Sequence, residues 1–165
     1  MSWTIRPERA GDEAAIAALT QRAFAGHPHS DGSEAEMIAR LRRDEDLLLS
    51  LVAEDGGEII GQVTYSRAHL STGDDGWMLL GPISVAPTRQ KEGIGRALTE
   101  AGEAAIRKMG AKGITVLGDP QLYSRFGFAQ HTPLRLKGEL ADYLQVKSFG
   151  AAVPEATVSF APAFG

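Results

Sequence analysis

The feature that most constrains the fold of this chain is a glycine-containing loop between a β-strand and a long amphipathic helix. The strand is predicted over residues 77–85, and the loop reads Gln-Lys-Glu-Gly-Ile-Gly over residues 90–95. Apolar side chains at helical spacing predict a helix from about Gly93 to Met109. A short apolar strand over residues 113–117 is typical of a strand buried on both faces. This order predicts two parallel strands joined by a crossover.

The rest of the chain alternates further helices and strands. Asp12 is the predicted N-cap of a helix that ends near Phe24, and Ser33 with Glu36 predicts a capping box for a second helix. Pro82 cannot donate to a sheet ladder, so it predicts a bulge or a locally unpaired position in the strand. The other predicted elements are strands over residues 2–6, 47–54, 58–70, 146–149 and 157–160, and a short helix over 122–126. Together they predict an α/β or α+β fold with a mixed sheet.

Length and composition narrow the class of protein. The 165 residues, of which 43% are hydrophobic, predict one domain over residues 1–165 that can bury its own core. The chain has no cysteine, which excludes disulfides and thiolate metal sites. We find no secretory signal and no apolar run near the ~20 residues of a membrane helix, and we expect a cytoplasmic protein without a membrane partner. A net charge of −4 without a basic stripe argues against nucleic acid.

The loop over residues 90–95 is suited to bind an anion. The first N–H groups of a helix have no partner within it and point outward at the positive end of the helix dipole. Gly93 and Gly95 lack Cβ atoms, so phosphate oxygens can approach the main chain closely. The spacing excludes a P-loop, and Leu98 stands where a dinucleotide fingerprint needs a third glycine. Taken alone, two glycines at a helix start are equally typical of tight helix–strand packing.

The motifs together resemble one family. Gln90, Gly93 and Gly95 match the pattern Gln/Arg-x-x-Gly-x-Gly/Ala of the GNAT superfamily of acetyl-CoA-dependent N-acetyltransferases. The strand with Pro82 before the motif, and the run Tyr-Ser-Arg-Phe-Gly-Phe over residues 123–128, are similar to further features of that superfamily. The likeness is greatest to its YhbS-type branch, through residues 48–54, 116–120, 125–128 and 162–164.

This resemblance implies a fold and a cosubstrate. The fold would be a mixed, mostly antiparallel central sheet of about six to seven strands, splayed at a bulge near Pro82, with helices on both faces. Acetyl-CoA would be the cosubstrate, and no metal is expected. The implied cofactor-binding residues are Ile83, Ser84, Val85, Gln90, Lys91, Glu92, Gly93, Ile94, Gly95, Arg96, Ala97, Asp119 and Tyr123.

The resemblance also implies individual roles. The backbone of residues 83–85 would pair with the pantetheine arm, and the N–H of Val85 would hydrogen-bond the thioester carbonyl and its oxyanion. Tyr123 would face the coenzyme sulfur as thiolate stabiliser or general acid. Many members carry an asparagine seven residues before this tyrosine, but position 116 is valine here. We expect Asp119 to compensate for that contact.

The general base cannot be identified from the sequence. Glu34 or Glu36 beside the acceptor cleft, or Glu54 at a strand end, is a candidate. The pair His27 and His29 has the spacing of two metal ligands, but the sequence offers no further partner to complete a metal site.

The predicted function is N-acetyltransfer from acetyl-CoA to a primary amine of a small molecule or peptide, by direct attack in a ternary complex. Two alternatives stay open: a non-catalytic acyl-CoA-binding or sensing module, and an acyltransferase that uses a different acyl-CoA. The sequence does not identify the acceptor. The resemblance also implies a possible homodimer.

Overall fold

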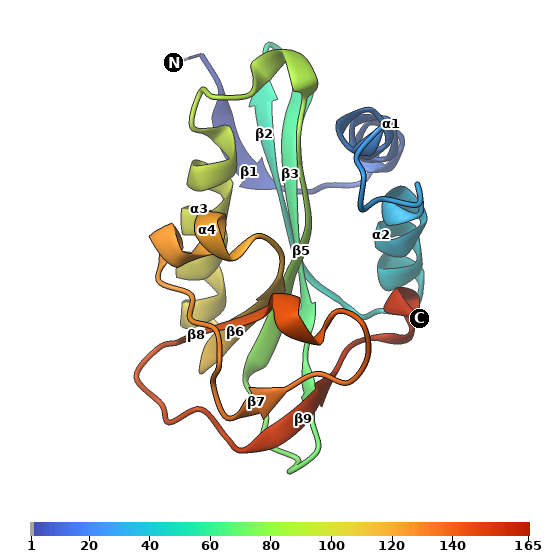
Figure 1. The fold of residues 1–165 in the computed structure, drawn as a ribbon. Helices are drawn as coiled ribbons and strands as arrows, with labels where there is room; N and C mark the ends of the chain where they lie inside the picture. The colour runs from blue at the N-terminus through green and yellow to red at the C-terminus, as the bar shows by residue number, and fades with distance from the viewer. Residues whose placement is uncertain (1) are drawn as a thin grey trace.

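The computed structural model describes residues 2–165, and a mixed six-stranded sheet forms its centre (Figure 1). The strands lie in the order β1-β2-β3-β5-β6-β8, and every neighbouring pair is antiparallel except β5 with β6. Their bounds are β1 Thr4–Pro7, β2 Leu47–Asp55, β3 Glu58–Arg67, β5 Trp77–Val85, β6 Gly113–Leu117 and β8 Leu144–Ser148. The predicted mixed, mostly antiparallel sheet is therefore confirmed.

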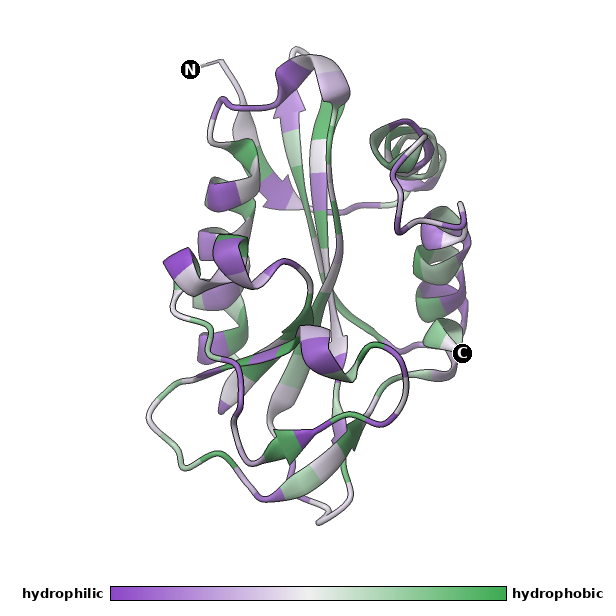
Figure 2. Ribbon diagram, viewed as in Figure 1, coloured by the Kyte–Doolittle hydropathy of each residue, from purple (hydrophilic) through white to green (hydrophobic). Residues whose placement is uncertain are grey.

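Helices cover both faces of this sheet (Figure 1). Helices α1 (Glu13–Phe24) and α2 (Glu34–Arg43) lie on one face, whereas α3 (Ile94–Lys108) and α4 (Pro120–Tyr123) lie on the other. Figure 2 shows apolar positions along the central strands and polar positions on the outer sides of the helices. The 3-10 helices are η1 Pro87–Arg89, η2 Ser124–Phe126, η3 Ala141–Tyr143 and η4 Pro162–Phe164.

A second, three-stranded sheet has the order β4-β9-β7, with β4 His69–Leu70, β7 Leu134–Arg135 and β9 Ala156–Ser159. The single strand predicted over residues 58–70 is wrong at its end, because β3 stops at Arg67 and β4 pairs with β9 instead. Leu70, Leu134 and Val158 bury their side chains in a hydrophobic cluster with Trp77. This local burial stabilises the small sheet apart from the central one.

Asp12 and Ser33 occupy the predicted N-cap positions of α1 and α2, but the predicted capping hydrogen bonds of their side chains are absent. The Asp12 carboxylate makes no cap hydrogen bond to α1; it accepts from Arg6 Nη1 at 2.8 Å and from the Arg9 N–H at 2.9 Å. The Ser33 hydroxyl donates to Asp31 Oδ1 and caps nothing in α2. In both places a charged partner competes successfully with the helix N–H groups for the side chain.

The bulge predicted at Pro82 is present. In the β3–β5 ladder Val63 lies opposite Ile83 and Tyr65 lies opposite Leu80. Two residues of β5 therefore stand opposite one residue of β3, which is the geometry of a β-bulge.

Within residues 2–165, no helix has the length and apolar character needed to cross a bilayer.

Candidate active site

Beyond the bulge, one edge of β5 has no neighbouring strand within residues 2–165. The parallel ladder between β5 and β6 runs from Trp77 with Gly113 to Leu80 with Val116 and stops there. On its other side, β5 stays paired with β3 as far as Val85. The sheet thus splays between β5 and β6, as the resemblance implied.

The register decides which backbone groups face the open edge. The Ala86 N–H donates to the Ile60 carbonyl at 2.8 Å, and hydrogen-bonded pairs alternate along an antiparallel ladder. Ser84 opposite Gln62 is therefore the next hydrogen-bonded pair. The N–H and C=O groups of Ile83 and Val85 consequently point away from β3, toward the open edge.

A second set of unpaired donors lies at the start of α3. The N–H groups of the four residues 93–96 make no hydrogen bond within residues 2–165. Gly93 has φ +85° and Lys91 has φ +69°, so the loop turns sharply into the helix. A Cβ atom on Gly93 would meet no heavy atom within 4 Å, and one on Gly95 would meet only Val85 Cγ2 at 3.6 Å. The space in front of these donors is open, and it fits an anionic group bound by main-chain N–H groups.

Arg89 anchors the loop that carries these donors. Its guanidinium lies 2.9 Å from Oδ2 of Asp55, the last residue of β2, and 2.8 Å from Glu92 Oε2. The hydrogen bonds that Arg89 donates to Glu92 and Asp55 raise the pKa of Arg89, and the hydrogen bonds that Asp55 accepts from Ser2 and Arg89 lower the pKa of Asp55. The positive charge of Arg89 is therefore paired with two carboxylates. Of the other basic groups here, Lys91 is exposed and Arg96 pairs with Glu100 at 3.1 Å.

Tyr123 lies at the end of α4 with its ring buried and 8% of the residue exposed. The ring packs edge-on against Phe126 and Phe128, at centroid distances of 6.2 and 5.6 Å. Burial raises the pKa of Tyr123 above its ordinary value. Its hydroxyl makes no hydrogen bond within residues 2–165 and is not sealed from solvent, so it is available to a ligand.

Val116 stands where many family members carry an asparagine, and Asp119 was expected to compensate for it; the contacts of both side chains are known from the structure. Val116 is buried in β6, where it pairs with Gln145 of β8. Asp119 Oδ1 accepts a hydrogen bond from the Gln121 N–H at 2.9 Å and caps α4. The Asp119 side chain thereby orients the helix that carries Tyr123.

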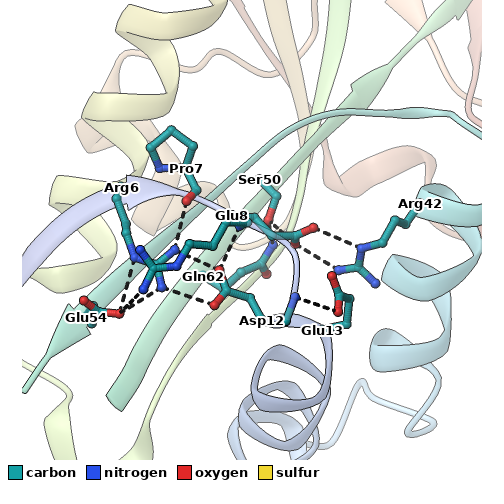
Figure 3. A network of polar contacts seen from close by, with 11 residues as sticks. Arg6, Pro7, Glu8, Asp12, Glu13, Arg42, Ser50, Glu54 and Gln62 are labelled. Atoms are coloured by element: carbon teal, nitrogen blue, oxygen red, sulfur yellow. Dashed lines mark hydrogen bonds and ion pairs between the residues drawn. The ribbon is translucent and has the colours of Figure 1, made fainter. Parts of the chain in front are cut away.

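The three candidate bases do not lie together. Figure 3 shows Glu54 in a polar network centred on Arg6. Arg6 Nη2 lies 2.8 Å from Glu54 Oε2, and Arg6 Nη1 lies 2.8 Å from Asp12 Oδ2. Glu36 is exposed, with its nearest cation Arg43 at 3.8 Å. Glu34 is half-buried and accepts from the Ser30 hydroxyl at 2.7 Å.

The same network engages a further carboxylate that sequence reasoning did not consider. Glu8 accepts from Arg42 and from the Ser50 hydroxyl, at 2.9 and 2.8 Å (Figure 3). His27 and His29 are exposed in the loop between α1 and α2. Among residues 2–165 no group of three or more side chains is arranged to hold a metal ion.

Sequence reasoning missed Arg89 and Gly118. Arg89 carried a weak signal, because its three-residue spacing to Glu92 permits an ion pair. Gly118 carried none. Its importance comes from the Tyr123 ring, which would lie 2.5 Å from a Cβ atom at position 118.

The splayed mixed sheet, the open edge of β5 and the free donors of α3 define an acetyltransferase domain of the GNAT type. The family model described as an acetyltransferase (GNAT) domain matches residues 47–130. The chain belongs to this family.

Similar proteins support the same assignment. The N-acetyltransferase YhbS of Escherichia coli K12 is 38% identical over 136 residues, which cover 81% of this chain and 78% of the relative. A GNAT acetyltransferase from Brucella melitensis, solved with acetyl-CoA, is 38% identical, with a TM-score of 0.89 and coverage of 99% and 98%. Escherichia coli YhbS, solved with CoA, is 31% identical, with a TM-score of 0.88 and coverage of 99% and 92%.

Proposed function

We propose that this protein transfers an acetyl group from acetyl-CoA to a primary amine by direct attack in a ternary complex. The observation that carries the proposal is the pairing of two sets of free backbone donors in one strand–loop–helix unit. One set, at Ile83 and Val85, lines the open edge of β5, and the other lies at the start of α3. The complexes of the two similar solved structures, with acetyl-CoA and with CoA, support it.

The two sets of donors suit the two ends of one elongated ligand. Acetyl-CoA, when bound, supplies an acetyl thioester at one end of its pantetheine arm and a pyrophosphate at the other. The N–H groups of residues 93–96 would hold the pyrophosphate at the positive end of α3. The backbone of Ile83 and Val85 would pair with the arm as an added strand. The Val85 N–H would donate to the thioester carbonyl oxygen and stabilise the negative charge that develops on it.

Tyr123 would donate a hydrogen bond to the sulfur that leaves. An ordinary thiol has a pKa near 8.5 and an ordinary tyrosine one near 10, so full proton transfer costs about 2 kcal/mol. Burial raises the pKa of Tyr123 further, which makes complete transfer still less favourable. We therefore propose that Tyr123 stabilises the thiolate by hydrogen bonding and keeps its proton.

The attacking amine must first lose a proton. A lysine-like amine, with a pKa of about 10.4, needs roughly 4–5 kcal/mol to reach its neutral form at pH 7. Glu54 is engaged by Arg6, and Glu36 is exposed beside Arg43. Glu34 accepts a hydrogen bond from Ser30 and lines a cavity that includes no residue of β5, β6 or α4. We propose that none of the three carboxylates is the base and that water on the open side of the cleft removes the proton.

The direct test measures free thiol release from acetyl-CoA across a panel of primary amines, with mass spectrometry of each product. Amine-dependent thiol release with an equal amount of acetylated amine supports the proposal. Tight binding of CoA without turnover on any amine would contradict it and favour a sensing module. Faster turnover with a longer acyl-CoA would instead identify a different acyl donor.

A further inference from the structure

Resting on the proposed function, we infer that a cavity between α1 and α2 selects acceptors that carry a second positive charge besides the amine to be acetylated. The cavity has a volume of about 260 Å³ and lies where the end of α1, the following loop and the start of α2 meet. Its lining includes Phe24 of α1, Ser30 of the loop and Glu34 of α2. Glu34 is the single charged residue of this lining.

The carboxylate of Glu34 makes no ion pair within residues 2–165, although it is half-buried. The Ser30 hydroxyl donates to its Oε1 atom, and no cationic side chain lies within 4.0 Å. By contrast, Glu8 and Glu54 each have an arginine nitrogen at 2.8 to 2.9 Å. A partly desolvated carboxylate that lines a cavity gains most from a ligand cation, since both hydrogen bonding and charge then compensate its burial.

Although α1 and α2 cover the opposite face of the sheet from α4, the loop that lines the cavity approaches the segment that carries Tyr123. The His29 ring, in the loop between α1 and α2, lies 6.3 Å from the Tyr143 ring between centroids. The Tyr143 carbonyl accepts from the Gly118 N–H at 3.3 Å, and Gly118 packs against Tyr123. These contacts connect the cavity-forming loop to the segment that carries the proposed thiolate stabiliser.

The cavity is nevertheless separate from the place where the acetyl group is transferred. None of its lining residues belongs to β5, β6 or α4, which carry Val85 and Tyr123. Glu34 therefore serves a charge that lies several bonds away from the reacting nitrogen. Phe24 adds an aromatic ring to the lining, which suits an ammonium group and its methylene neighbours.

The acceptor class that follows is an amine with a second ammonium group at the far end of an apolar chain. An acceptor with a single amine would place its nitrogen at the thioester and leave Glu34 without a cation. A diamine would present one nitrogen to the thioester and keep the other charged beside Glu34. Linear diamines and the monoamines of the same chain lengths are thus the matched probes.

The variant Glu34→Gln tests this inference, because it removes the charge and keeps the shape and the hydrogen bond from Ser30. Glu36→Gln is the control: it lies in the same helix, is exposed and does not line the cavity. Affinities of the diamines for the CoA-saturated protein are measured by calorimetry, and kcat/KM is measured for both series of amines. Thermal unfolding checks that the variants keep their fold.

We expect the wild type and Glu36→Gln to favour a diamine over its monoamine by about tenfold or more in kcat/KM. In Glu34→Gln the preference falls to within about twofold, through a higher KM for the diamine, while kcat for monoamines stays unchanged. Equal use of both series by the wild type, or a preference that survives in Glu34→Gln, would overturn the inference.

The binding measurement separates this inference from the proposed function. Glu34-dependent binding of diamines without turnover would support the cation subsite and contradict the acetyltransferase proposal. Turnover of monoamines with no Glu34-dependent binding of diamines would support the acetyltransferase proposal and overturn the cation subsite.

Discussion

Gly118 lies directly against the ring of Tyr123: a Cβ atom at position 118 would be 2.5 Å from Tyr123 Cε2. Asp119, which lies between Gly118 and α4, caps this helix by accepting a hydrogen bond from the Gln121 N–H. Phe126 and Phe128 contact the same ring edge-on. The ring of Tyr123 is therefore held by a backbone surface, a helix cap and two aromatic neighbours.

The variant Gly118→Ala should displace this ring. We expect it to lower the free energy of unfolding by about 1–3 kcal/mol, as overpacked sites do, and to lower turnover as well. In a Tyr123→Ala background the alanine at position 118 has no ring to meet, so its cost should largely disappear. Chemical denaturation of the four proteins of this double-mutant cycle measures the effect. The same cost in both backgrounds would show that the ring does not need Gly118.

Removal of the Tyr123 hydroxyl should affect catalysis more than binding. We expect Tyr123→Phe to lower kcat by about 10-fold to 100-fold, because the thiolate loses its hydrogen bond, while the Kd for acetyl-CoA stays nearly constant. Tyr65→Phe is the control: the Tyr65 hydroxyl donates to the Thr99 carbonyl in the core, so the variant should lose stability and keep its kcat. Steady-state kinetics and calorimetry distinguish the two, and wild-type kcat in Tyr123→Phe would make this residue structural.

A carboxylate at the start of α3 should prevent binding of CoA. Gly95→Glu places a negative charge at the four free N–H groups and in the open space before them. We expect the Kd for CoA to rise by about 10-fold to 100-fold, because the new carboxylate competes with the pyrophosphate for the N–H donors and repels its charge. Gly95→Ala adds only a Cβ atom 3.6 Å from Val85 Cγ2 and should weaken binding less. If calorimetry finds unchanged affinity in Gly95→Glu, the pyrophosphate lies elsewhere.

The ion pair between Arg89 and Asp55 should aid CoA binding because it holds the loop before α3 in place, and not because of its effect on the local charge. Asp55→Asn removes a negative charge, which by itself would favour an anionic ligand. We nevertheless expect a Kd for CoA about threefold to tenfold higher, because the loop loses its link to the end of β2. Glu100→Gln, which removes an exposed partner of Arg96 instead, should leave the Kd equal or lower. Tighter binding of CoA by Asp55→Asn would exclude the positional role.

The ion pair of Asp12 with Arg6 predicts a pH dependence of stability. The hydrogen bond from Arg6 lowers the pKa of Asp12, so the pair stabilises the fold above the ordinary carboxyl pKa of about 4 and loses this contribution as pH falls further. We expect Asp12→Asn to cost about 1–2 kcal/mol near pH 7, and the difference from wild type to shrink below about pH 4.

Denaturation curves across this pH range measure the difference between the two proteins. The control Asp44→Asn breaks an exposed pair with Arg40 and should change stability by less than about 0.5 kcal/mol. A cost for Asp12→Asn that stays constant down to low pH would show that the carboxylate charge contributes nothing.

Most of the fold follows from local patterns in the sequence. The strands predicted over residues 2–6, 146–149 and 157–160 differ from β1, β8 and β9 by only one or two residues at their ends. Pro82 predicted the bulge because its missing N–H group is a local property. The N-cap positions of Asp12 and Ser33 are confirmed, but their side chains do not cap the helices because they have other partners, and the partner of Asp12 comes from another element.

The site could be predicted only where a motif describes it. The loop over residues 90–95 indicated free donors, and the register of β5 adds those of Ile83 and Val85. The packing of the Tyr123 ring against Gly118 and the cavity at Glu34 depend on how separate segments meet. A single sequence contains no local signal for such contacts.

The most direct test of the account is residue-resolved amide hydrogen exchange with and without acetyl-CoA. The N–H groups of Ile83 and Val85 face the open edge, whereas that of Ser84 is already paired with Gln62 of β3. At saturating acetyl-CoA we predict slower exchange, by about tenfold or more, at Val85 and at the N–H groups of residues 93–96, with Ser84 unchanged. Unchanged exchange at Val85 and at the start of α3 under conditions where acetyl-CoA binds would contradict the account.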